Sequence, residues 1–318
     1  MKKPLPKIFL IGTCFLCICL IPQMFLAQQV SVQEVDLRNG HIELPGTLSY
    51  PEGLGGVPLA IFVHGSGNID RNGNQAGTFV QSNYIKTLSD SLTAHGIAFF
   101  RYDKRTAVAQ NLAKLGAITL YDFAADVKTA LAHFKNDDRF TSIVLLGHSQ
   151  GALVGLLSID ASVSKYISIA GAGITIDKTL VGQIAQQSPE LSLICQAHID
   201  ELMEKDTIAT VNPMLLQLFA PQHQKFLKSW MLIDPVKIIK SIDIPILILN
   251  GDADLQVTVA DAEKLKTAQP NARLKVISKM NHVLKEVNSM AENQKAYMDE
   301  NVPLSHDLVV EITQFIKN

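Results

Sequence analysis

The chain has 318 residues, of which 47% are hydrophobic and 18% are charged, which is an ordinary composition for a globular protein with a large core. Its 28 basic residues nearly balance its 30 acidic residues, and no basic patch or long charge run interrupts the sequence. Nucleic acid is therefore excluded as an expected partner. No internal repeat or low-complexity tract is present.

Residues 1–27 have the pattern of a secretory signal peptide. Three lysines precede an apolar run over residues 8–21, and Ala27 provides a small residue for cleavage. An uncleaved anchor is the alternative, but the run before Pro22 has 14 residues, fewer than the roughly 20 that span a bilayer. We therefore expect a secreted or periplasmic protein over residues 28–318, without a stable membrane anchor after cleavage.

Cysteine usage predicts a mature domain without an internal disulfide. Three of the four cysteines lie in the predicted signal segment, and Cys195 remains alone. A domain of this size does not need a disulfide. We expect Cys195 to be buried as a small hydrophobic residue rather than to act as a nucleophile.

Predicted strands and helices alternate through most of the chain. Alternating apolar and polar residues around a turn at Asn39-Gly40 indicate a hairpin, continuous apolar runs indicate buried strands, and four-residue apolar spacing indicates helices. In chain order, the predicted elements are the hairpin over residues 30–50, strands over 57–63, 97–100, 142–146, 166–170, 245–249 and 274–277, and helices over 79–94, 119–135, 152–157, 258–268 and 305–317. This alternation predicts a mostly parallel, doubly wound α/β sheet with functional groups at the carboxyl ends of its strands.

The alternation stops after Gly173. Residues 174–241 have helical periodicity and no clear strand before the sheet resumes at Pro245. Because a structureless connection of this length would be unusual, we interpret the segment as a helical lid over the strand ends; an elaborated crossover is the alternative. We therefore expect one catalytic domain with an inserted lid and no second domain with its own core.

The pentapeptide GHSQG has the G-x-S-x-G spacing of a nucleophile elbow, and it lies between a predicted strand and a predicted helix. Gly147 and Gly151 lack the β-carbons that would clash in a sharp turn, and the turn exposes the hydroxyl of Ser149. The amide of Gln150 then lies at a helix N-terminus, where it can face an oxyanion. A plain glycine-rich turn is the alternative for the pentapeptide alone.

A serine nucleophile needs a base, and the base needs an orienting carboxylate. Two further polar segments each follow a predicted strand, NGDAD at residues 250–254 and SKMNH at 278–282. We assign His282 as the base and Asp254 as the acid, because Asp254 has room to turn back toward the histidine. Asp252 is the competing acid, and we expect it to shape its own turn instead.

The loop after the strand over residues 57–63 is expected to supply the second oxyanion donor. It reads His64-Gly-Ser-Gly67, and its small residues allow close approach of the backbone to a substrate. We assign the backbone N–H of Ser66, with Gly67 as the alternative. No paired His and Cys spacing indicates a metal site, and no cofactor is expected.

Five segments together resemble the bacterial α/β-hydrolases related to EstD-type carboxylesterases, and they are HGSGNIDRNGN, RYDKR, GHSQG, NGDADLQV and KMNH. In that family a GSGxxDRDG-like loop follows the third strand, a DKRG-like loop follows the fourth, and GxxDxxV and NH close the triad. The resemblance covers the chain from about residue 58 to its end and implies Ser149 as nucleophile, Asp254 as acid and His282 as base. The chain departs from the family after Arg105, where Thr106 replaces glycine.

The same two loops contain charged residues whose role is open at this point. These are Asp70, Arg71, Asp103 and Arg105. They either contact a substrate or form an ion-pair network that holds the loops together, and we favour the network.

The combined prediction is an α/β-hydrolase fold and a secreted serine hydrolase that cleaves neutral, short-to-medium acyl carboxylic esters through an acyl-enzyme. Its partner is a small-molecule ester. An aminopeptidase-like amidase and a thioesterase are alternatives on the same triad. A non-catalytic hydrolase fold used for binding is the alternative from another class.

Overall fold

The computed structural model describes residues 1–2 and 29–318. The predicted signal peptide, with Cys14, Cys17 and Cys19, lies outside the described residues except for its first two positions. Within the described part of the chain, no helix is both long and apolar enough to cross a membrane.

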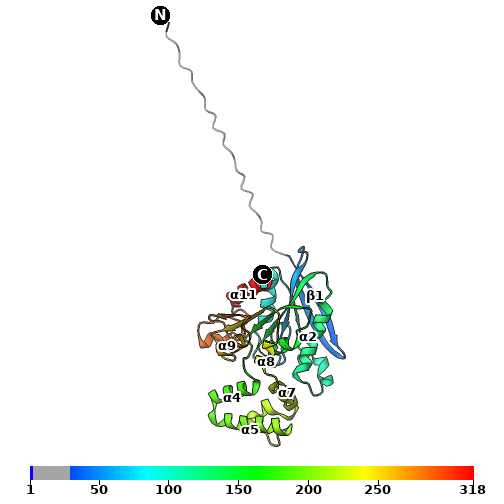
Figure 1. Cartoon of the computed structure of the whole chain (residues 1–318), viewed down its shortest axis with the longest axis vertical. Coiled ribbons are helices and arrows are strands. Elements are labelled where there is room, and N and C mark those ends of the chain that lie inside the picture. The colour runs from blue at the N-terminus through cyan, green and yellow to red at the C-terminus, as the bar shows by residue number, and fades with distance from the viewer. Residues whose placement is uncertain (3–28) are drawn as a thin grey trace.

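The sheet has eight strands in the order β1-β2-β4-β3-β5-β6-β7-β8. It runs through the molecule with helices on both of its sides (Figure 1). The predicted hairpin is present as β1 (Val30–Asn39) and β2 (Ile42–Pro51), which pair antiparallel, and β2 also pairs antiparallel with β4. All other neighbours pair parallel. The remaining strands are β3 (Val57–Val63), β4 (Ala98–Tyr102), β5 (Phe140–His148), β6 (Val163–Ile169), β7 (Ile246–Gly251) and β8 (Arg273–Ile277). The prediction of a mostly parallel, doubly wound sheet is confirmed.

Each face of the sheet is covered by its own layer of helices, and the central strands are apolar on both faces. In β3, Leu59 and Ile61 pack into one hydrophobic cluster and Ala60 and Phe62 into another, because successive side chains of a strand point to opposite faces. The first cluster includes residues of α2 (Leu120–Phe134), α3 (Gln150–Ser158), α8 (Pro235–Lys240) and α9 (Val259–Ala268). The second includes residues of α1 (Tyr84–Ala94) and α11 (His306–Lys317).

Three local differences from the predicted elements have identifiable causes. Helix α1 begins at Tyr84 rather than near residue 79, because Asn83 adopts a left-handed conformation with φ of 49° and bonds to Asn74 instead of continuing a helix backward. Two short helices were not predicted, η1 (Ala109–Lys114) and α10 (Met290–Lys295). Both are only 6 residues long, too short to show an apolar period.

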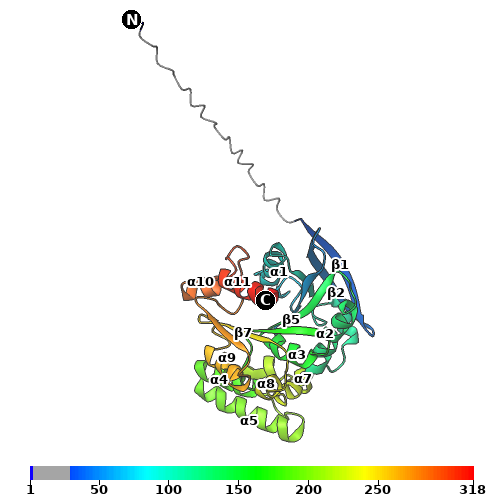
Figure 2. The ribbon, with the colours of Figure 1, turned by 45° about the horizontal axis from the view of Figure 1, so that its top comes forward.

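Between β6 and β7 the chain forms the predicted helical segment. Its helices are α4 (Ile176–Gln187), α5 (Pro189–Lys205), η2 (Pro213–Leu215), α6 (Leu216–Phe219), α7 (Pro221–Met231) and finally α8. Figures 1 and 2 show α4, α5 and α7 grouped together on the side of the sheet that carries α8 and α9. We call residues 176–231 the helical insertion.

The helical insertion has a small hydrophobic cluster of its own. Cys195, Leu202, Phe219 and Leu227 belong to this cluster, whereas Ile239 of α8 packs into the main core. The boundary between the two therefore lies before α8. Cys195 is buried as expected, and burial raises the pKa of its thiol to about 11.

Candidate active site

Ser149 lies at the tight turn between β5 and α3, with φ of 55° and ψ of −123°. A β-carbon on Gly147 would lie 2.4 Å from the carbonyl oxygen of Gly151, and one on Gly151 would lie 2.1 Å from that of Val63. Both glycines are therefore required by space, as the sequence predicted. The surrounding sheet and helix hold Ser149 in a conformation that a non-glycine residue rarely adopts.

Asp254 and His282 form a buried pair at the ends of β7 and β8. His282 Nδ1 lies 2.8 Å from Asp254 Oδ2, while Asp254 Oδ1 accepts hydrogen bonds from the backbone N–H groups of Gln256 at 2.8 Å and Val257 at 3.0 Å. Burial acts to raise the pKa of Asp254, but the His282 ring and the N–H donors outweigh it and hold the pKa below its usual range. The carboxylate is thus ionised and aimed at the histidine.

Asp252, the competing acid, is bonded elsewhere. Its Oδ1 accepts a hydrogen bond from the backbone N–H of Lys279 at 2.5 Å. It shapes the site by joining the loops after β7 and β8 rather than by bonding its own backbone. Gly251 allows the loops after β7 and β8 to lie this close together, since a β-carbon on Gly251 would lie 1.9 Å from the carbonyl oxygen of Met280.

His148 connects the nucleophile turn to the histidine loop. In the described part of the chain, no hydrogen bond joins the Ser149 hydroxyl directly to His282. Instead, His148 Nε2 lies 2.8 Å from the carbonyl oxygen of His282, and its Nδ1 lies 3.3 Å from the Tyr84 hydroxyl. Because a carbonyl only accepts, Nε2 is the protonated nitrogen of a neutral ring. This role of His148 is not apparent from the sequence.

Burial keeps His148 neutral. Burial first, and the neighbouring His282 second, lower the pKa of His148 to about 3. A neutral ring with a fixed tautomer holds the backbone of His282 at a constant distance from the turn that carries Ser149. In unliganded enzymes the catalytic hydrogen bonds themselves often tighten only when substrate binds.

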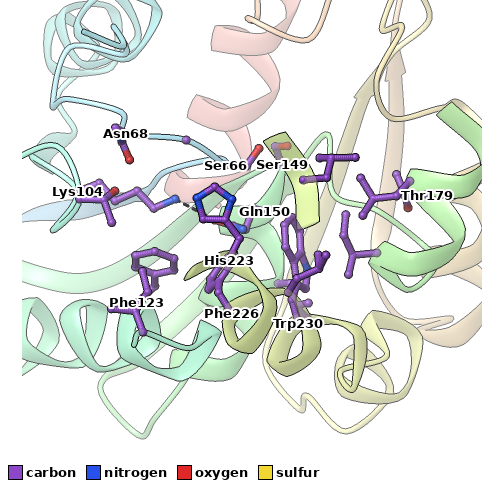
Figure 3. A pocket seen from close by; sticks show the side chains of 18 of the residues that line it. Ser66, Asn68, Lys104, Phe123, Ser149, Gln150, Thr179, His223, Phe226 and Trp230 are labelled. Carbon is purple, nitrogen blue, oxygen red and sulfur yellow. Dashed lines mark hydrogen bonds between the residues drawn. The ribbon is translucent and has the colours of Figure 1, made fainter. Parts of the chain in front are cut away.

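The predicted oxyanion donors border the same cavity as Ser149. Ser66, Gly67 and Gln150 all line it, and Figure 3 shows the side chains of Ser66 and Ser149 next to each other. Among the described residues, none accepts a hydrogen bond from the backbone N–H of Ser66 or of Gln150. Gly65 lets the loop after β3 approach Ser149 closely, because a β-carbon on Gly65 would lie 3.3 Å from Ser149 Cβ.

Lys104 is a functional-site residue that sequence analysis did not single out. Its Nζ donates hydrogen bonds to the carbonyl oxygen of Gly65 at 2.7 Å and to Gln150 Oε1 at 2.8 Å, and the second bond is visible in Figure 3. The ammonium lies 4.3 Å from the centroid of the Phe123 ring. Burial lowers the pKa of Lys104 to about 7, against an opposing effect of Asp126.

The other charged residues of the two loops make structural contacts, and the two arginines form ion pairs. Arg71 Nη2 lies 2.9 Å from Asp103 Oδ2, which joins the loops after β3 and β4 as expected. Arg105 differs from the expectation, because it pairs with Asp126 of α2 at 2.7 Å rather than with the other loop. Asp70 accepts from two backbone N–H groups of its own loop. None of the four predicted residues lines the cavity.

The cavity beside Ser149 has a volume of about 880 Å³ and is enclosed partly by the helical insertion. Among the described residues that line it, Lys104 is the only lysine, arginine or acidic residue. The apolar residues of α6 and α7 that line the cavity are Leu218, Phe226, Leu227 and Trp230. Leu215 and Phe219 instead pack inside the insertion. In the described residues, no cluster of His, Cys, Asp and Glu could hold a metal ion.

The chain is similar to several known hydrolases. The sequence profile of the alpha/beta hydrolase family matches residues 60–292. Esterase EstD from Thermotoga maritima is 28% identical over 265 residues, which are 80% of this chain and 60% of that protein. The chain thus spans about 60% of the length of this relative.

Solved structures with the same fold are more distant in sequence. Est1E from Butyrivibrio proteoclasticus superposes with a TM-score of 0.57 at 16% identity, covering 90% of this chain and 99% of that one. An acylaminoacyl peptidase from Pyrococcus horikoshii superposes with a TM-score of 0.57 at 12% identity, covering 92% of this chain and 42% of that one. At these identities the likeness establishes the fold.

Proposed function

The chain belongs to the alpha/beta hydrolase family, and we propose that it is a serine esterase acting through Ser149, His282 and Asp254. The observation that carries this proposal is a strained elbow serine, bordering a large cavity, whose turn is tied through His148 to a buried His282–Asp254 pair. The resemblance to an esterase of Thermotoga maritima supports the choice of ester hydrolysis.

In the proposed reaction, Ser149 Oγ attacks the ester carbonyl carbon while His282 Nε2 removes the hydroxyl proton. The carbonyl oxygen becomes an oxyanion and accepts hydrogen bonds from the backbone N–H groups of Ser66 and Gln150. His282 then passes its proton to the departing alcohol, which leaves an acyl-enzyme. Water, deprotonated by His282, attacks this acyl group, and His282 then returns the proton to Ser149 Oγ as the carboxylic acid leaves. Asp254 stabilises the imidazolium in both halves of the reaction.

The lining of the cavity supports neutral esters as substrates. A mostly apolar wall binds an acyl chain through the surface it buries, at roughly 25 cal/mol per Å². The acids of the insertion that could capture a free amino terminus, Glu190, Asp200, Glu201 and Glu204, are absent from the residues that line the cavity. We therefore propose short-to-medium neutral acyl esters as substrates rather than peptides with a charged terminus.

A panel of p-nitrophenyl esters and aminoacyl anilides tests this proposal, with fluorophosphonate labelling as a second readout. The wild type is expected to cleave neutral esters fastest and to be labelled at Ser149. Ser149→Ala, which keeps the fold, is expected to show neither property. Faster cleavage of anilides than of any ester would replace the esterase by an amidase. An unlabelled, inactive wild type would indicate a binding protein.

We also propose that the protein is exported and that the mature chain begins near Gln28. The motivation is the charged start, the apolar run and Ala27. The intact mass of protein recovered outside the cytoplasm is expected to correspond to a chain starting near this residue. A full-length mass in the membrane fraction would instead support an N-terminal anchor.

A further inference from the structure

The peptide group between Gly65 and Ser66 accepts a hydrogen bond at its C=O and carries the proposed oxyanion donor at its N–H. Lys104 Nζ donates to its carbonyl oxygen at 2.7 Å. In a planar trans peptide the C=O and N–H groups point in opposite directions. The bond from Lys104 therefore fixes the plane of this peptide and aims the Ser66 N–H away from Lys104.

The same ammonium also bonds to Gln150, the residue that supplies the other proposed oxyanion donor. Lys104 Nζ donates to Gln150 Oε1 at 2.8 Å, and Gln150 is the first residue of α3, directly after Ser149. Lys104 comes from the loop after β4, so it is separated from Gly65 by 39 positions and from Gln150 by 46. One side chain thus connects the two segments between which the oxyanion would form.

The charge of Lys104 has no carboxylate partner among the described residues. Asp126, whose charge acts to raise the pKa of Lys104, instead accepts bonds from Arg105 Nε and Nη2, each at 2.7 Å, and from Asn39 Nδ2 at 3.0 Å. Lys104 is left with two neutral oxygens and the face of Phe123. A buried, unpaired ammonium is unfavourable for stability, so its presence beside the nucleophile calls for a functional reason.

We propose that Lys104 is a positioning residue of the oxyanion hole. It fixes the Gly65–Ser66 peptide and Gln150 so that both backbone N–H groups converge on the developing oxyanion. In the protonated form, its positive charge also polarises these groups in a site of low dielectric, which strengthens them as donors. This inference rests on the proposed esterase function, since it assigns a role in the same reaction.

Lys104→Met tests the inference, because methionine has a similar length but neither donates nor carries charge. Losing one oxyanion donor costs about 10²- to 10³-fold in kcat in a serine protease, so losing the residue that positions two donors is expected to lower kcat about 10- to 100-fold. KM for a neutral ester such as p-nitrophenyl butyrate is expected to change less than about threefold, because the ground-state carbonyl depends little on this hole.

Lys165→Met is a matched control far from the cavity. Lys165 Nζ also donates to two carbonyl oxygens, those of Phe315 at 2.9 Å and Ile316 at 3.0 Å, and lies 5.6 Å from the Phe315 ring centroid. The same chemical change is therefore made at a lysine that does not line the cavity. Its kcat is expected to stay at the wild-type value.

Affinity for a trifluoromethyl ketone separates a positioning role from a general structural one. This inhibitor forms an oxyanion adduct with the serine, so its Ki is expected to rise in Lys104→Met by about the factor by which kcat falls. If that variant does not fold, Gln150→Met, which removes one of the two contacts, is expected to lower kcat by a smaller factor.

The outcomes distinguish this inference from the proposed function. A wild type that hydrolyses no ester and is not labelled by a fluorophosphonate defeats the esterase proposal. An active wild type with unchanged kcat in Lys104→Met or in Gln150→Met defeats only the role of Lys104. A loss of activity in Lys165→Met equal to that in Lys104→Met would also overturn it.

Discussion

At the scale of single residues, the carboxylates of Asp252 and Asp254 have different structural roles although they are only two positions apart. Asp254 directs Oδ2 at His282 and Oδ1 at two backbone N–H groups, whereas Asp252 accepts from the backbone of the next loop. The first contact sets the tautomer of a base, and the second sets the shape of a loop. A substitution by asparagine separates these functions, because it preserves one oxygen and replaces the other by a donor.

Asp254→Asn is expected to lose about 10⁴-fold in kcat, as the equivalent change does in a serine protease. The new amide would donate to His282 Nδ1 and force the proton onto Nε2, so that the ring could no longer accept the serine proton. In Asp252→Asn the Oδ1 acceptor for Lys279 remains, and kcat is expected to stay within about tenfold. Steady-state kinetics on a p-nitrophenyl ester make the comparison, and the reverse ranking would transfer the acid role to Asp252.

The residues of the proposed triad were predictable because each lies in a short motif directly after an apolar run. Lys104 and His148 were not, because their roles depend on contacts with residues far away in the sequence. His148 bonds to a carbonyl 134 positions away, and Lys104 bonds to oxygens 39 and 46 positions away. Nothing in the local pattern of RYDKR distinguishes Lys104 from Arg105, which forms an ordinary buried ion pair.

At the scale of elements, the helical insertion divides its apolar residues between two environments. Trp230 and Phe226 of α7 face the cavity, with ring centroids 6.0 Å apart, whereas Phe219 is fully buried inside the insertion. The apolar pattern of the sequence predicted these helices. It could not predict which face lines the cavity, because α7 has apolar residues both toward the cavity and toward the core of the insertion. The packing of α8 into the main core could not be inferred from the sequence either, because this helix has only 6 residues, too few to show an apolar period.

Trp230→Ala is expected to reduce kcat/KM for octanoate esters about fivefold more than for acetate esters. A longer acyl chain would lose about 40 Å² of apolar contact, which at roughly 25 cal/mol per Å² corresponds to about 1 kcal/mol. Kinetics on a series from acetate to octanoate measure the effect.

Phe219→Ala provides the control for this series. It removes a comparable aromatic ring from the same insertion but leaves the cavity wall in place. It is expected to lower stability without changing the ratio of octanoate to acetate activity. If both variants change that ratio equally, the effect comes from a loosened insertion and Trp230 does not line the acyl site.

At the scale of the whole molecule, the alternation of strands and helices predicted the class of sheet but not the order of its strands. β4 inserts between β2 and β3, which places the Lys104 loop beside the loop that carries Ser66. That order depends on packing between segments that are distant in the sequence, and the periodicity of a single segment does not predict it. The same packing buries His64 and His148 between the sheet and the site.

These two buried histidines are expected to make the fold sensitive to acid. Burial is the main cause that lowers the pKa of each to about 3, aided by Lys104 for His64 and by His282 for His148. In the unfolded chain both titrate near pH 6.5, so between about pH 6.5 and 3 the unfolded state binds more protons than the folded state. Their contribution to stability is complete above pH 6.5 and is lost as the pH falls toward 3.

Urea unfolding at pH 7.5, 6.5, 5.5 and 4.5 measures this dependence. Each histidine is expected to lower the free energy of unfolding by about 1.4 kcal/mol per pH unit once the pH is well below 6.5, so the two together give about 2.7 kcal/mol per unit. The depressed pKa of Asp254 acts in the same direction at lower pH.

His148→Gln keeps a donor for the His282 carbonyl but does not titrate, so it is expected to halve the slope between pH 5.5 and 4.5. A wild-type free energy that stays constant from pH 6.5 to 4.5 would show that these histidines are not held neutral in the fold.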